Sequence, residues 1–222
     1  VFVVHRDYPF ELEKMRILAL GCPVYEQKES RQAVRARLGL PQDVVILTTL
    51  GLLSPWKRIP EIVGRILAQR SPNDRVFLQI LTPLPGAEVQ AEAAAVQQLA
   101  SGQPDVLFST EFRPEKDLLD RVYASDLGVL YHAQNTGSVS AATKQFVSGR
   151  TPLVITGSSH ASDLQGGVVR VEGFDPADLA EAALSLARDE RRRAALREEA
   201  EREYARLNMN EVARRLAELL QG

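Results

Sequence analysis

The fold is decided by residues 44–58, which read VVILTTLGLLSPWKR. The first seven residues of this stretch are apolar or β-branched, which is typical of a strand buried on both faces. Gly51, Ser54 and Pro55 then predict a turn, and a helix is predicted over 59–69. A buried strand followed by a turn and a helix is the repeating unit of a parallel α/β sheet.

The same alternation continues along the chain. Further strands are predicted over 75–82, 105–109, 127–131, 152–156 and 167–171, and further helices over 29–38, 87–99, 114–124, 140–148, 175–188 and onward to 220. We therefore predict an α/β fold over residues 29–222, a doubly wound, Rossmann-like parallel sheet with a helical C-terminus.

Residues 1–28 do not show this alternation of strands and helices. They are interpreted as a leading segment, a linker or remnant attached to a missing partner domain. Because the chain opens on Val1 rather than methionine, we expect that it was cut from a longer protein.

The amino-acid composition argues against several classes of protein. The net charge is −2, with 45% hydrophobic and 25% charged residues. This is an ordinary globular profile without the basic excess of a nucleic-acid binder, so no nucleic-acid partner is expected. The single cysteine, Cys22, excludes an internal disulfide and favours a reducing compartment, and we predict a cytoplasmic protein. The apolar runs are too short for a transmembrane segment, and no signal peptide is recognised.

The first loop to search for a ligand site is 51–58, because ligands of such sheets bind beyond the carboxyl ends of the strands. Gly51 allows a tight turn and close approach of a ligand. The following helix start supplies free N–H groups, and Lys57 and Arg58 add two cations, a combination suited to a diphosphate. The alternative is that both cations lie in solvent while Trp56 packs.

The second loop, 132–140, places a glycine and small hydroxyl residues before a helix, which also suits an anion or a sugar. Its candidate ligand-binding residues are Thr136, Gly137, Ser138 and Val139. The alternative is simple N-capping by Ser138 or Ser140. Lys144, one turn into the helix, points either toward the ligand or out to water, and both alternatives stay open.

The third loop, 109–114, contains Phe112 and Arg113. An aromatic ring and a planar cation are able to stack on a nucleobase and bond its edge. The alternative, which the residues alone favour, is that Phe112 packs in the core while Arg113 is exposed.

Several motifs are absent from the sequence. There is no Gly-x-Gly-x-x-Gly after the first strand, no P-loop and no Gly-x-Ser-x-Gly, which argues against dinucleotide oxidoreductases, P-loop NTPases and α/β-hydrolases. There is also no Asp-x-Asp and no histidine pair at ligand spacing. We therefore predict no metal site and no cofactor.

Three segments carry a resemblance to a known family. They are DRVYASDLGVL at 120–130, SGRTPLVI at 148–155, and DPADLA at 175–180, which is followed by 191–196. In order and spacing, residues 30–222 resemble the C-terminal, donor-binding domain of the group 1 family of retaining glycosyltransferases, which have the GT-B fold. The resemblance implies one Rossmann-like half of a GT-B fold, which binds a nucleoside-diphosphate sugar as donor substrate.

The family's functional residues are only partly matched. A family lysine that holds the donor diphosphate corresponds to Lys57. The family arginine just after the glycine corresponds to Leu52, so one cation is missing unless Arg58 replaces it. Two family glutamates correspond to Thr136 and Lys144, neither of which is acidic. A subgroup of the family has a similar loop, against which only one glutamate, here Ser138, is lost.

The resemblance implies sugar transfer to an acceptor with retention of anomeric configuration. Lys57 is expected to stabilise the departing diphosphate, helped by Arg58 and the amides of Gly137, Ser138 and Val139. The acceptor would be held by a missing N-terminal domain, without which this chain is expected to be nearly inactive. Three alternatives stay open: a nucleotide-sugar-binding module that has lost catalysis, a sugar-nucleotide epimerase, and an unrelated doubly wound domain. The nucleotide base, sugar and acceptor are not predicted.

Overall fold

The computed structural model describes residues 2–3, 16–133, 139–157 and 159–221. Its centre is a six-stranded sheet with the order β5-β4-β3-β6-β7-β8, and every neighbouring pair is parallel. The strands are β3 (Val45–Leu50), β4 (Val76–Leu81), β5 (Val106–Ser109), β6 (Leu127–Leu130), β7 (Leu153–Thr156) and β8 (Val168–Val171). From β3 to β5 the chain adds each new strand on one side of β3, and from β6 to β8 it adds strands on the other side. The boundary between β3 and β6 is therefore the switch point of the sheet, where ligands of such sheets bind.

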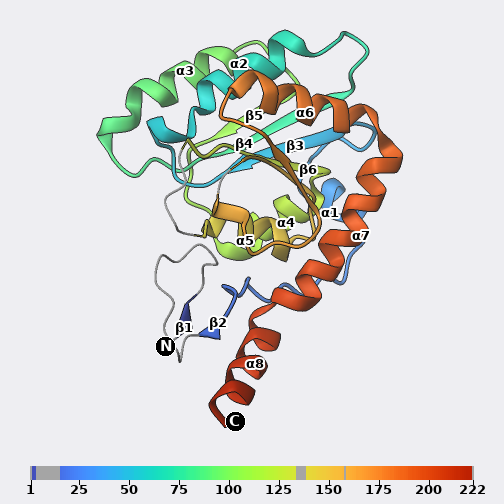
Figure 1. Ribbon diagram of the computed structural model, residues 1–222. Helices are drawn as coiled ribbons and strands as arrows, with labels where there is room; N and C mark the ends of the chain where they lie inside the picture. The colour runs from blue at the N-terminus through green and yellow to red at the C-terminus, as the bar shows by residue number, and fades with distance from the viewer. Residues whose placement is uncertain (1, 4–15, 134–138, 158, 222) are drawn as a thin grey trace.

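Helices cover both faces of the sheet (Figure 1). One face carries α2 (Ile59–Gln69), α3 (Gln90–Ala100) and α6 (Pro176–Arg188), and the other carries α1 (Arg31–Arg37), α4 (Glu115–Ala124) and α5 (Ala141–Ser148). The prediction of a doubly wound, Rossmann-like α/β fold is therefore confirmed.

The core lies in two layers because the strands are apolar on both faces. In β3, Leu47 packs into the cluster under α2, α3 and α6, whereas Leu50 packs into the cluster with α5. The polar side chains buried in β3 and β4, Thr48 and Gln79, are paired: Thr48 Oγ1 lies 2.6 Å from Oγ of Ser125, which follows α4, and Gln79 Nε2 donates to Thr48 Oγ1 at 3.0 Å. Such pairing removes the cost of burying them.

A glycine in β6 sets the position of α5. A Cβ built on Gly128 would lie 2.5 Å from Cε1 of Phe146, a fully buried ring on α5. Any larger residue at Gly128 would therefore push this helix away from the sheet. The close contact brings the start of α5 to the carboxyl edge of the strands, where the candidate site lies.

The C-terminal helices leave the sheet. The long helix α7 (Glu190–Leu207) runs down one side, and α8 (Met209–Gln221) extends beyond it (Figure 1). Near their junction, Cys22 N donates to Leu207 O at 2.7 Å. Tyr25 Oη donates to Oδ1 of Asp120, on α4, at 2.5 Å. The stretch around Cys22 and Tyr25 is thus packed against the domain.

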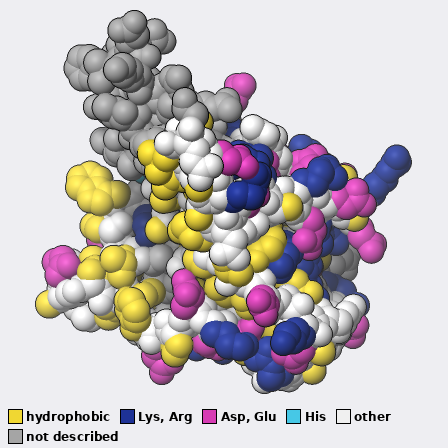
Figure 2. Space-filling view, turned by 90° about the horizontal axis from the view of Figure 1, so that it is seen from below, with side chains coloured by type: hydrophobic (Ala, Val, Ile, Leu, Met, Phe, Trp, Pro, Cys, Tyr) yellow, Lys and Arg dark blue, Asp and Glu magenta, His cyan; other side chains and the backbone are white. Residues whose placement is uncertain are grey.

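A two-residue parallel strand pair, β1 (Phe2–Val3) with β2 (Arg16–Ile17), is drawn outside the six-stranded sheet, in the lower part of Figure 1. The surface on that side mixes both signs of charge with hydrophobic side chains (Figure 2). Within the described part of the chain, no helix combines the length and the apolar character needed to cross a bilayer.

Candidate functional site

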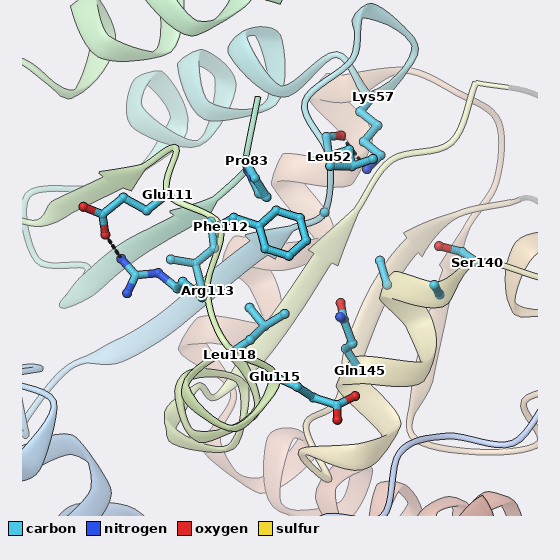
Figure 3. Close-up of a pocket in the computed structure, with 14 residues that line it drawn as sticks. Leu52, Lys57, Pro83, Glu111, Phe112, Arg113, Glu115, Leu118, Ser140 and Gln145 are labelled. Carbon is cyan, nitrogen blue, oxygen red and sulfur yellow. Dashed lines mark hydrogen bonds and ion pairs between the residues drawn. The ribbon is translucent and has the colours of Figure 1, made fainter. Parts of the chain in front are cut away.

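A cavity of about 460 Å³ lies at the carboxyl ends of β3, β4 and β5 and against the start of α5. Its walls come from the loops after those three strands, from the first turn of α4 and from the first turns of α5 (Figure 3). It therefore occupies the edge of the sheet where the sequence placed the candidate ligand loops. Its volume is in the range of small-molecule sites.

Gly51 and Lys57 lie together in this cavity. Gly51 has φ +106°, and a Cβ built there would lie 2.7 Å from Nζ of Lys57. The Lys57 ammonium donates to the carbonyl oxygen of Leu52 at 2.7 Å. Burial lowers the pKa of Lys57 below its usual value, because a partly desolvated ammonium is less stable than a hydrated one. An anion in the cavity would offset this cost.

Arg58 lies elsewhere, although it is next in sequence. Its backbone is left-handed (φ 46°), and its Nε pairs with Glu61 Oε1 at 3.2 Å. The guanidinium lies 5.8 Å from the ring centre of Tyr131, and Arg58 does not line the cavity. The structure thus does not bring Arg58 to the ligand position that the sequence suggested. Trp56 is 72% exposed, so the alternative in which it packs is wrong.

Phe112 and Arg113 both line the cavity, and the favoured alternative for them is wrong in both parts. Phe112 is 84% exposed rather than packed in the core. Arg113 is only 16% exposed; it pairs with Asp117 at 2.9 Å and donates to Ser109 Oγ at 2.8 Å. The ring of Phe112 points into the cavity (Figure 3).

The loop before α5 is only partly described. Thr136, Gly137 and Ser138 lie outside the described residues. Val139 is partly buried and does not line the cavity. The N-cap residue Ser140 makes no side-chain cap, and its own amide donates to the His160 carbonyl at 3.3 Å.

Three residues of α5 line the cavity: its first two and, one turn further on, Gln145. The first two are Ala141 and Ala142. The first amides of a helix have no partner within the helix, so this end of α5 is suited to bind an anion.

Lys144 points neither toward the cavity nor out to water, so neither of the two alternatives predicted for it holds. It is 2% exposed, and its Nζ pairs with Asp163 Oδ2 at 2.5 Å. The Asp163 carbonyl also accepts from Arg206 at 2.6 Å. Lys144 does not line the cavity, so its predicted contact with a substrate is not supported.

Among the cavity residues that the sequence analysis did not select as site residues are Glu115 and Gln145. Glu115 opens α4 directly after Pro114, so the helix-start signal at the end of a searched loop could have found it. Gln145 lies four residues after Ala141 and so shares its face of α5. Lys144 is rotated from Gln145 by about 100° around the same helix.

Beside Lys57 lies a pair of stacked histidines. The rings of His132 and His160 are 3.9 Å apart with an interplanar angle of 28°. Burial, followed by the nearby charges of His160 and Lys57, lowers the pKa of His132 to about 3. His132 is therefore neutral at physiological pH, and neither ring lines the cavity.

No protein-family model matches the chain, but curated proteins do. The chain is 31% identical over 198 residues to D-inositol 3-phosphate glycosyltransferase 1 of Catenulispora acidiphila; the match covers 84% of this chain and 46% of that protein. It is 29% identical over 196 residues to D-inositol 3-phosphate glycosyltransferase of Thermobispora bispora, with 85% and 46% covered. Its homologues are glycosyltransferases. The predicted resemblance is confirmed, and the chain spans about half the length of these relatives.

Solved glycosyltransferase structures share the fold. HepE of Anabaena, in complex with UDP and glucose, superposes with a TM-score of 0.78 at 16% identity, and 99% of this chain and 62% of that chain are covered. WaaG, a glycosyltransferase involved in lipopolysaccharide biosynthesis, gives 0.73 at 16% identity, with 100% and 62% covered. At such identities the likeness establishes the fold alone, one Rossmann-like half of the GT-B type.

Proposed function

We propose that this chain is the donor-binding half of a glycosyltransferase, and that the cavity at the carboxyl edge of its sheet holds a nucleoside-diphosphate sugar. The observation that carries the proposal is the Lys57 ammonium, held in the cavity beside Gly51, with the start of α5 in the same wall. A partly desolvated cation next to a helix start is a site for a diphosphate.

In the proposed reaction, the bond between the anomeric carbon and the diphosphate breaks, and that carbon bonds to the oxygen of an acceptor hydroxyl, which gives up its proton. Negative charge grows on the departing diphosphate. Lys57 and the amides at Ala141 and Ala142 stabilise that charge. Because the charge is larger in the transition state than in the bound donor, these contacts accelerate the reaction rather than merely tighten binding.

Phe112 is proposed to stack on the nucleobase. Its ring is almost fully exposed and points into the cavity (Figure 3), and a base has an apolar face that an aromatic ring covers well. UDP is the first nucleotide to test, because HepE, which has a similar fold, was solved with UDP and with UDP-glucose.

The remaining parts of the proposal concern the whole protein. We propose transfer with retention of anomeric configuration and without a metal ion, Lys57 taking the place of a divalent cation at the diphosphate. We also propose that residues 29–222 form the donor domain, that an N-terminal domain holds the acceptor, and that the protein acts in the cytoplasm. The relatives' length, about twice the matched region, supports a second domain.

A second candidate function is a nucleotide-sugar-binding module without catalysis. One observation favours it: the position of a family glutamate is occupied by Lys144, which is buried in an ion pair with Asp163 and makes no contribution to the cavity. Such a module would bind the nucleotide sugar and leave it intact.

The test has two stages. Calorimetric titration of this chain with UDP, GDP and ADP is expected to show binding of one nucleotide. A full-length protein containing the chain is then incubated with the matching nucleotide sugar and candidate acceptors, and the product is examined by NMR. Transfer with retained configuration supports the enzyme, and binding without turnover supports the module. Absence of binding in both forms contradicts both functions.

A further inference from the structure

The helix whose start lies in the cavity wall, α5, is packed tightly against the sheet. Three of its residues line the cavity, Ala141, Ala142 and Gln145 (Figure 3). Phe146, the next residue, lies against β6, where a Cβ on Gly128 would come within 2.5 Å of its ring. This contact sets the distance between helix and sheet. The direction in which the start of the helix points depends on what holds its first turn.

The segment that follows β7 contacts the first turn of α5 at two points. The carbonyl oxygen of His160 accepts a hydrogen bond from the amide of Ser140, the N-cap residue of α5, at 3.3 Å. One turn further on, Nζ of Lys144 pairs with Oδ2 of Asp163 at 2.5 Å. These contacts join the cavity end of α5, rather than its far end, to the segment after β7.

The same segment is also anchored to β8 and α7. Arg170, on β8, donates to the carbonyl oxygens of Ala161 and Leu164 at 2.7 and 2.9 Å. Arg206, on α7, donates to the carbonyl oxygen of Asp163 at 2.6 Å. Two guanidinium groups from two other elements thus fix the backbone that α5 contacts, so the segment is a firm support for the helix.

The ion pair between Lys144 and Asp163 is buried. The two side chains are 3% and 6% exposed, and neither lines the cavity. Among the described residues, the Asp163 carboxylate has no second ion-pair partner, and its Oδ1 accepts no hydrogen bond. Removing both charges from water largely offsets their attraction, so such a pair adds little stability over a well-packed apolar pair. What an apolar pair lacks is a directed contact between one atom of the helix and one atom of its support.

We propose that Lys144 and Asp163 are positioning residues, which hold the first turn of α5 where its free amides meet an anion in the cavity. The inference rests on the proposed function, in which this anion is the diphosphate of the donor. Lys144 does not touch the ligand, and its effect passes through the helix. Because hydrogen bonds weaken steeply at poor distances and angles, a displaced helix start would bind the diphosphate less well. Contacts to the base, proposed to lie at Phe112, would be unchanged.

The pair also has a purely structural interpretation, in which it stabilises the domain and does not affect ligand binding. Arg35 on α1 provides a matched control, because it forms a buried pair with Asp126 at 2.6 Å, with side chains 7% and 20% exposed. Arg35 also donates to the carbonyl oxygen of Val44, directly before β3, and Asp126 directly precedes β6. This control pair therefore lies at the amino ends of the strands, opposite the cavity.

The test compares affinity for a nucleoside diphosphate with affinity for its nucleoside. The tightest-binding of UDP, GDP and ADP, and its nucleoside, are titrated by calorimetry into the wild type, Lys144→Met, Arg35→Met and the double variant Lys144→Met/Asp163→Leu. Lys144→Met is expected to lose about tenfold or more in affinity for the diphosphate and about twofold or less for the nucleoside. Arg35→Met is expected to keep the wild-type ratio of the two affinities, although it too breaks a buried pair.

The double variant separates position from stability. It leaves no unpaired buried carboxylate, so its stability in urea denaturation is expected to recover much of the loss seen in Lys144→Met. Its affinity for the diphosphate is expected to stay low, because the directed contact between α5 and its support is still absent. If Lys144→Met does not fold, the double variant decides the question alone.

Each contrary result has a defined meaning. Wild-type diphosphate affinity in the double variant, an unchanged ratio in Lys144→Met, or an equal fall of the ratio in Arg35→Met overturns the positioning role. In each case a loss of diphosphate affinity in Lys57→Met leaves the proposed function standing. A wild type that binds none of the three nucleotides overturns the proposed function, and the positioning role falls with it.

Discussion

The ammonium of Lys57 occupies the space in which a side chain on Gly51 would begin. A Cβ at Gly51 would lie 2.7 Å from Nζ of Lys57, and the backbone of Gly51 has φ +106°. The glycine thus does two things at once. It turns the chain at the end of β3, and it leaves room for the cation that we propose holds the diphosphate.

Gly51→Ala is therefore expected to damage the site more than the fold. The positive φ costs an alanine roughly 1–3 kcal/mol, and the new methyl displaces Lys57, so nucleotide affinity falls about tenfold or more. Gly39→Ala is the matched control, because Gly39 also has a positive φ (+66°) but nothing within 4 Å of its Cβ position. Urea denaturation and calorimetric titration separate the two effects. Equal nucleotide affinity in the two variants would contradict the role of this contact.

Phe112→Ala is expected to lower nucleotide affinity without loss of stability. The ring is 84% exposed, so little packing is lost, whereas stacking on a base contributes roughly 1–3 kcal/mol. Trp56→Ala provides the control, since Trp56 is 72% exposed and does not line the cavity. Both variants are titrated with the same nucleotide. The stacking role fails if Phe112→Ala binds as tightly as Trp56→Ala.

Acid is expected to destabilise the fold through His132. Its pKa in the folded chain is about 3, against about 6.5 in an unfolded chain. Between these values the unfolded state binds the proton, so stability is complete above about pH 6.5 and declines as the pH falls toward 3. The slope from this group approaches about 1.4 kcal/mol per pH unit. His132→Asn should flatten the pH dependence of the unfolding free energy, measured by urea denaturation at pH 4 to 7. Parallel curves for the variant and the wild type would contradict this account.

Lys144 is expected to matter for stability. Lys144→Met leaves the buried carboxylate of Asp163 without its cation, which typically costs about 3–5 kcal/mol. Lys144→Met with Asp163→Leu removes both charges and should recover much of that loss. The free energy of unfolding is measured by urea denaturation for all three proteins. A cost below about 1 kcal/mol in the single variant would show that the pair is not important for the fold.

The strands and helices could be predicted because each is encoded locally. The apolar run at 44–50 and the turn residues after it predicted β3 and its loop to within about a residue. The edge of the sheet that carries the site could be predicted as well, because the carboxyl ends of parallel strands lie together. Lys57 was correctly placed on that edge because it is fixed by the short loop between β3 and α2.

The directions of individual side chains could not be predicted. Phe112 and Arg113 are adjacent in sequence, and which of them turns inward depends on Asp117 and Ser109, which bind the guanidinium. Lys144 was misplaced because its partner, Asp163, is brought to it only by tertiary folding.

The measurement that tests the central claim most directly compares a nucleoside diphosphate with its nucleoside. The tightest-binding of UDP, GDP and ADP, and the corresponding nucleoside, are titrated into the wild type and into Lys57→Met, which keeps most of the side-chain length and removes the charge. We predict that Lys57→Met loses about tenfold or more in affinity for the diphosphate and binds the nucleoside as the wild type does. Unchanged affinity for the diphosphate would contradict the assignment of Lys57, and with it the donor site.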